Sequence, residues 1–136
     1  MKKALLILFI TITSLTACKK DPEDRLKGRW NLTKAYSVES TNGTKTSEHT
    51  ETYKKGQLYI VFDGNNISMY EDGKLDDSGT FTATENSITI KSKNGDEETS
   101  QLRWNSKKEF VVISEGTDVI NGFTYDYKSE MTFNKD

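Results

Sequence analysis

Apolar side chains alternate with polar ones along much of the chain, which is the pattern of strands rather than helices. The clearest example lies near the C-terminus, where only Ser129 interrupts the row. The row consists of Phe123, Tyr125, Tyr127, Met131 and Phe133. Placement at every second residue puts these side chains on one face of a strand, so that face can be buried while the other meets solvent. The pattern therefore predicts a long strand with one buried face.

Shorter segments of the same kind precede this strand, and turn residues separate them. The segments are residues 30–38, 58–63, 67–70, 74–83, 87–91, 101–105 and 110–113. Pairs such as Asp72-Gly73 and Asn94-Gly95 supply the positive φ angles of tight hairpin turns. We therefore expect an all-β fold of eight antiparallel strands in an up-and-down meander. Pairing of the first strand with the last would close it into a barrel and remove its edges.

Two segments fall outside this pattern. Residues 39–51 are polar throughout, so they form either a loop or a polar hairpin centred on Asn42-Gly43, and the loop is our preferred interpretation. Residues 22–27 have the composition of a single helical turn leading into the barrel, and no longer helix is predicted. The barrel domain is expected to span residues 27–136.

The N-terminal segment has the features of a secretion signal. Lys2 and Lys3 precede a short apolar run, residues 4–13, that is too short for a permanent membrane helix. The sequence Leu15-Thr16-Ala17-Cys18 that follows resembles the bacterial lipobox. This resemblance implies that residues 1–17 are removed and that Cys18 carries the lipid, with acyl chains such as palmitate. An ordinary secretory signal that happens to end in Cys is the alternative.

The predicted lipid on Cys18 indicates the location of the protein in the cell. Residues 18–26 would form a lipidated, charged tether, and its lysines and acidic residues resemble those of lipoproteins from the Bacteroidetes group. We expect a protein attached to the outer membrane through the lipid on Cys18, on the periplasmic or the cell-surface side. A plain solvated linker is the alternative interpretation of the tether.

Composition and charge narrow the expected partners. Only 33% of the residues are hydrophobic, which suits strands that bury one face. Loss of Lys2 and Lys3 with the signal reduces 19 basic residues to 17 against 21 acidic ones, a net charge of −4. This lack of basic excess argues against nucleic acid as a partner. The single Cys excludes a disulfide within the chain.

Catalytic and metal-binding chemistry has little support in the sequence. His49 is the only histidine, so a histidine metal cluster, or a Ser-His-Asp triad built on any other position, is excluded. Asp76 and Asp77 form an acidic pair, but they lie beside the Gly73 turn, where a solvated hairpin end is the simpler interpretation. We therefore predict no enzyme activity, no metal and no cofactor.

Short motifs in order along the chain are similar to those of lipocalins. Gly28-Arg29-Trp30 resembles the Gly-x-Trp that opens the first lipocalin strand, where the Trp plugs the closed end of the barrel. The other matching pieces are Phe62-Asp63-Gly64, Ser78-Gly79-Thr80-Phe81, Ser87-Ile88-Thr89-Ile90 and Met131-Thr132-Phe133. The chain thus resembles the lipocalin-like lipoproteins of the Bacteroidetes type over residues 26–136. The resemblance implies a barrel that binds a small molecule.

Two functions are favoured for such a barrel, and a third, an enzyme or an enzyme inhibitor, ranks last. The first is a binding module for a small apolar or amphipathic ligand, with residues 39–57 as a flap. Its inward-pointing candidate residues are Tyr36, Leu58, Ile60, Met69, Trp104, Tyr125 and Tyr127. The alternative is a structural or protein-interaction lipoprotein of the cell envelope with a solid barrel core. In that case Tyr59, Val61 and Val111 would form an outward apolar patch for an envelope protein.

Overall fold

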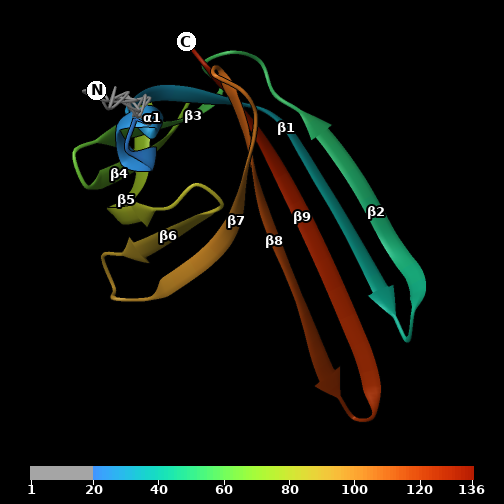
Figure 1. The fold of residues 1–136 in the computed structure, drawn as a ribbon. Coiled ribbons are helices and arrows are strands. Elements are labelled where there is room, and N and C mark those ends of the chain that lie inside the picture. The colour runs from blue at the N-terminus through green and yellow to red at the C-terminus, as the bar shows by residue number, and fades with distance from the viewer. Residues whose placement is uncertain (1–19) are drawn as a thin grey trace, which may run out of the picture.

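The structure of the protein is a computed structural model that describes residues 20–136. The predicted signal peptide and Cys18 lie outside the described residues. The described part contains one short helix and nine strands (Figure 1). They are α1 (Pro22–Leu26), β1 (Gly28–Thr41), β2 (Thr44–Thr52), β3 (Leu58–Asp63), β4 (Asn66–Glu71), β5 (Lys74–Ala83), β6 (Ser87–Ser92), β7 (Glu97–Ser106), β8 (Glu109–Ile120) and β9 (Phe123–Lys135). The helical turn expected near residue 22 is confirmed.

Eight of the nine strands form a closed antiparallel barrel. Each strand from β3 to β8 pairs with the next one along the chain, and β1 pairs with both β3 and β9. Trp30 marks the closure, because it lies opposite Ile60 of β3 and also opposite Lys135 of β9. The predicted eight-stranded up-and-down barrel is therefore confirmed. Strand β2 is additional to it.

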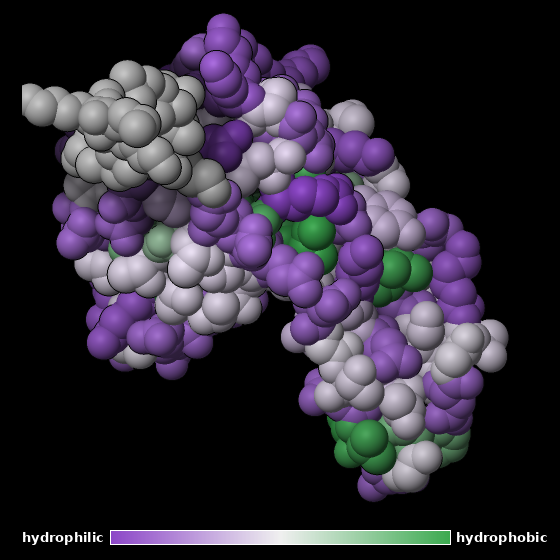
Figure 2. All heavy atoms as spheres, viewed as in Figure 1, coloured by the Kyte–Doolittle hydropathy of each residue, from purple (hydrophilic) through white to green (hydrophobic). Residues whose placement is uncertain are grey.

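Three of the barrel strands continue beyond the barrel and form an arm with β2. The arm consists of residues 34–52 and 114–129, in the strand order β2, β1, β9, β8. It leaves from the end of the barrel opposite α1 and the C-terminus (Figure 1). The space-filling view shows a hollow between barrel and arm, with apolar side chains near the far end of the arm (Figure 2).

The loop predicted for residues 39–51 is wrong, and the polar hairpin left as its alternative is present. Strand β2 pairs with β1 around a turn at Asn42 and Gly43, whose φ angles of 51° and 76° lie in the left-handed region. Every residue of β2 is exposed. No apolar alternation was visible because neither face of this hairpin is covered by another layer.

A β-bulge changes the phase of β1. The pairing of β1 with β9 shifts between Leu32 and Lys34, so one extra residue enters β1. A one-residue shift moves all later side chains to the opposite face. Trp30 and Leu32 therefore point into the barrel, whereas Tyr36 lies on the outer face of the arm, opposite Glu130. The common phase predicted for residues 30–38 is wrong after the bulge.

The closed end of the barrel is filled by aromatic side chains. Trp30 is fully buried and lies edge-on to Phe110, with 4.7 Å between ring centroids, and to Trp104 at 5.9 Å. Its indole N–H donates to the carbonyl oxygen of Leu26, which ties α1 to the barrel end. The core residues lie between positions 26 and 133, so a chain that begins at residue 19 contains the whole core. Trp30 plugs the closed end, as the resemblance to lipocalins implied.

Candidate functional site

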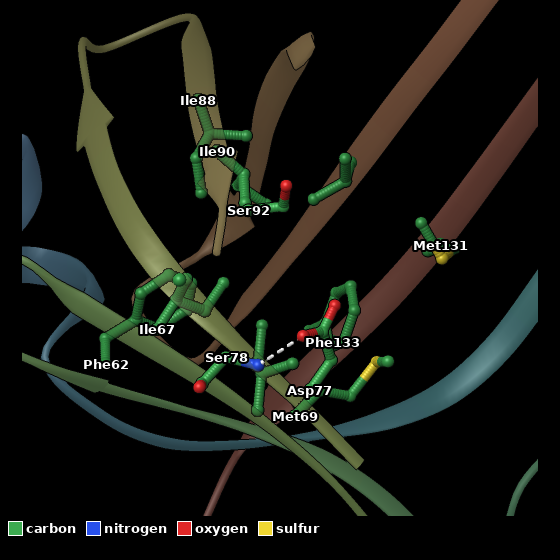
Figure 3. A pocket seen from close by; sticks show the side chains of 13 residues that line it. Phe62, Ile67, Met69, Asp77, Ser78, Ile88, Ile90, Ser92, Met131 and Phe133 are labelled. Atoms are coloured by element: carbon green, nitrogen blue, oxygen red, sulfur yellow. Dashed lines mark hydrogen bonds between the residues drawn. The ribbon is translucent and has the colours of Figure 1, made fainter. Parts of the chain in front are cut away.

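The open half of the barrel contains a cavity of about 240 Å³. Its lining comes from six strands of the barrel, β3, β4, β5, β6, β8 and β9 (Figure 3). The lining residues are Ile60, Phe62, Ile67, Met69, Asp77, Ser78, Gly79, Ile88, Ile90, Ser92, Val112, Met131 and Phe133. Most of them are apolar, which is the usual character of a site for a small organic ligand.

Gly79 keeps part of the cavity wall free of side chains. The backbones of β5 and β6 approach so closely there that an added Cβ at Gly79 would lie 2.2 Å from the carbonyl oxygen of Lys91. A larger residue is therefore excluded unless the strands move apart. The large aromatic side chains concentrate at the closed end instead, so the barrel is solid at one end and hollow at the other.

One polar group in the cavity wall has an unused hydrogen-bonding capacity. The hydroxyl oxygen of Ser92 is buried and has no hydrogen-bond partner among residues 20–136. Buried polar groups are normally paired, because an unpaired one loses its hydrogen bonds to water without replacement. By contrast, the carboxylate of Asp77 accepts a hydrogen bond from the backbone N–H of Ser78 at 2.7 Å. The Ser92 hydroxyl can therefore donate to or accept from a bound ligand.

Two of the predicted ligand-binding residues, Ile60 and Met69, line this cavity. Leu58 is half-buried against the core, outside the lining. Trp104 packs at the closed end, where the guanidinium carbon of Arg25 lies 3.7 Å from its ring centroid. Ligand contact at all four positions stays a prediction, but Trp104 belongs to the plug of the barrel.

The three predicted tyrosines lie on the arm, so their expected position inside the barrel is corrected. Tyr125 and Tyr127 follow the predicted phase of β9, but their side chains are 41% and 48% exposed because β9 has left the barrel there. Tyr36 was turned outward by the bulge, and its hydroxyl donates to a carboxylate oxygen of Glu48 at 2.9 Å. That hydrogen bond raises the pKa of Tyr36.

The structure forms neither the flap predicted for residues 39–57 nor the outward patch predicted for Tyr59, Val61 and Val111. Residues 44–52 are β2 of the arm, and the loop after it is held against the barrel by the Gly56 N–H, which donates to Asn31 at 3.0 Å. Val111 is buried at 2% exposure, and the ring of Tyr59 stacks on Tyr70 at 4.9 Å. The large apolar side chains that the described part exposes include Val119, Ile120 and Phe123 of the arm instead.

Sequence reasoning missed several residues of the cavity wall. Met131 and Phe133 belong to the recognised alternating row, and Ile88 and Ile90 to another, yet aromatic residues with polar tips were preferred as candidates. Position along the strand was the missing information: only those members of a row that lie in the open half of the barrel reach the cavity. Ser92 carries no local sequence signal, because its role depends on burial.

Comparisons with known proteins concern the fold only. No protein-family model and no curated protein matches this chain. Two solved structures are similar: a lipocalin-like protein from Bacteroides uniformis and an uncharacterized protein from Bacteroides eggerthii. The first is 16% identical over 82% of this chain and 99% of that one, with a TM-score of 0.48. The second is 10% identical over 76% and 98%, with a TM-score of 0.43.

The strand order itself supports the lipocalin-like barrel expected from the sequence motifs. Within residues 20–136, no group of three or more His, Cys, Asp or Glu side chains is placed to hold a metal ion. The same residues include no helix with the length and apolar character needed to cross a membrane.

Proposed function

We propose that this chain is a lipid-anchored binding protein that holds a small apolar or amphipathic ligand in the open half of its barrel. The observation that carries the proposal is the apolar cavity of about 240 Å³ with the unpaired Ser92 hydroxyl in its wall. The lipobox-like residues 15–18 support attachment through Cys18 to the outer membrane, on its periplasmic or surface side. No catalytic step is part of this proposal.

The cavity would bind its ligand chiefly by removing apolar surface from water. Each buried methylene contributes about 0.8 kcal/mol. A chain of seven carbons would therefore gain roughly 5–6 kcal/mol before the cost of immobilising it. A dissociation constant of about 0.1–1 mM is expected for such a minimal probe. A hydroxyl on the probe would also supply the missing partner of Ser92.

The test is a titration of the soluble chain, residues 19–136, with 1-heptanol, followed by NMR of the methyl groups of Ile88 and Met131. Saturable shifts of both signals are expected. The Ile90→Trp variant fills the cavity and should abolish them, whereas Val119→Trp, on the exposed arm, should leave them unchanged. Absence of saturable shifts in the parent chain, or their persistence in Ile90→Trp, would contradict the proposal.

Protein interaction in the cell envelope is the second candidate function. It is favoured by the end of the arm, where Val119 and Ile120 are 70% and 56% exposed. A photo-crosslinking residue at position 120 of the full-length lipoprotein should then give an adduct with one envelope protein in intact cells. The same residue at Lys93, in a turn on another part of the barrel, is the control. Equal labelling at both positions would contradict this function.

A further inference from the structure

We propose that the ligand is an elongated, uncharged amphiphile whose outer part lies on an aromatic ledge outside the barrel. The aromatic ledge consists of Phe123, Tyr125 and Tyr127, on the face of the arm that is continuous with the inside of the barrel. This inference rests on the proposed function and adds the chemical class of the ligand.

The ledge and the cavity lie on one continuous strand face. Met131 and Phe133 of β9 line the cavity, and the pairing of β9 with β8 has no irregularity from Asn134 to Phe123. Alternation along an unbroken strand therefore places the ledge on the same face as Met131 and Phe133. At ~3.3 Å per residue, the face runs for roughly 33 Å from Phe133 to the end of the arm.

The ledge presents ring surface to solvent. An added Cβ at Gly116 would lie 2.5 Å from the hydroxyl oxygen of Tyr127 and 2.6 Å from its ring, so this ring covers the β8 backbone at Gly116. Phe123, Tyr125 and Tyr127 remain 50%, 41% and 48% exposed. With ~150–250 Å² per aromatic side chain, about 200–350 Å² of the three stays accessible. Exposed apolar surface of that extent often marks a binding site.

The cavity is too small for a long ligand, so part of such a ligand must project out of the barrel. A volume of 240 Å³ holds roughly eight groups that each take the ~30 Å³ of a water molecule in the liquid. Any further atoms must pass through the open end, into the hollow between barrel and arm (Figure 2). Ser37, Ser129 and Ser114 lie side by side across β1, β9 and β8 at this point. The Ser114 hydroxyl is hydrogen-bonded to that of Ser100, and the hydroxyls of Ser37 and Ser129 suit a polar group at the middle of the ligand.

The charges around the ledge select against an anion. A hollow of about 450 Å³ beside Tyr125 and Tyr127 is also lined by Glu39 and Asp118. The lysines of the arm are Lys34, Lys45 and Lys128, and their pairing partners place them on the opposite face. A carboxylate or phosphate on the ledge would therefore meet like charge, and Lys128, which borders a second hollow beside Tyr127, is already paired with Glu130. The hydroxyls of a neutral polar group can instead donate hydrogen bonds to the carboxylates.

Three probes with the same heptyl chain test this inference on residues 19–136. They are 1-heptanol, which fits the cavity alone, n-heptyl β-D-glucoside, which adds a neutral polar ring, and octanoate, which adds a carboxylate. We expect all to shift the Ile88 methyl signal and the glucoside alone to shift the ring signals of Tyr127. The glucoside should bind about fivefold more tightly than heptanol, the size of one aromatic stacking contact, and octanoate more weakly than both.

Two variants and a control separate the ledge from the cavity. Tyr127→Ala removes one ring, and Gly116→Ala displaces that ring by the contact described above. Both should reduce the affinity for the glucoside to that for heptanol, without changing the affinity for heptanol. Val119→Thr, on the other face of the same hairpin, should change neither affinity.

The outcomes distinguish the two proposals. If heptanol itself fails to bind, the proposed function fails. If heptanol binds but the glucoside has no advantage, or if octanoate binds most tightly, the ledge inference is overturned while the binding function stands. Sedimentation of the free chain gives a further check, because a dimer that Tyr127→Ala dissociates would identify the ledge as a contact with a second copy and overturn the inference as well.

Discussion

The unpaired hydroxyl of Ser92 is expected to destabilise the ligand-free protein and to form a hydrogen bond when a ligand binds. Its hydroxyl is buried without a partner, so Ser92→Ala should raise the free energy of unfolding by about 1 kcal/mol, measured by urea denaturation. The same variant should bind 1-heptanol about fivefold more weakly, because one hydrogen bond is lost. A clear decrease in stability would show that the hydroxyl is paired in the folded protein.

Gly79 and Gly116 offer a matched pair of strand glycines. Replacing Gly79 with Ala brings a Cβ against the Lys91 carbonyl of the backbone, and we expect a loss of about 1–3 kcal/mol in the free energy of unfolding. At Gly116 the clash is with the Tyr127 side chain, which can turn away, so the loss should stay below about 1 kcal/mol. Equal losses in urea denaturation would contradict this distinction.

Single residues also show what the sequence could and could not predict. Trp30 was placed correctly because Gly28-Arg29-Trp30 resembles the motif that opens the first lipocalin strand at the closed end. Tyr36 was misplaced, since a bulge at Thr33 leaves no mark in the pattern of apolar residues. Burial of Ser92 depends on strands far apart in the chain, and the sequence pattern contains no information about it.

At the scale of elements, the arm is expected to be more dynamic than the barrel. Residues 109–113 of β8 lie between β7 and β9, whereas residues 114–120 pair with β9 alone. Amides on the free side of residues 114–120 should therefore exchange with deuterium much faster than those of residues 109–113. Hydrogen exchange followed by NMR measures this, and uniform protection along β8 would mean that another strand covers the edge.

The barrel strands were predictable because each buries one face, and this leaves alternation and turn residues in the sequence. The arm was not, because β2 is exposed on both faces and therefore carries no alternation. The extension of β8 and β9 beyond the barrel was equally hidden, since the aromatic ledge continues the alternating row of the buried part.

At the scale of the whole molecule, stability should fall in acid. Hydrogen bonds from Lys128 to Glu130, from Asn105 to Glu109, and from Lys55 to Asp136 lower the pKa of these carboxyls. Such groups stabilise the fold above their unfolded pKa, ~4, and this contribution is lost as the pH falls through their folded pKa. Urea midpoints should therefore decrease below about pH 4.

Glu130 provides the control for that pH dependence. Its partner Lys128 lies two residues away on β9, whereas Arg103 lies on β7, so the ion pair with Arg103 reaches across β8. The amide of Glu130→Gln does not titrate, so this variant should show a shallower decrease in urea midpoint as the pH falls through the usual carboxyl pKa of about 4. An unchanged slope would show that this carboxyl is not coupled to folding.

Native mass spectrometry of the protein made in its own host shows directly whether the open half of the barrel holds a ligand. A secreted form with Cys18→Ser avoids detergent, which could itself occupy the site. We expect one non-covalent amphiphile per chain in this form and none in the same form carrying Ile90→Trp. A chain without bound mass, or the same bound mass in both forms, would contradict it.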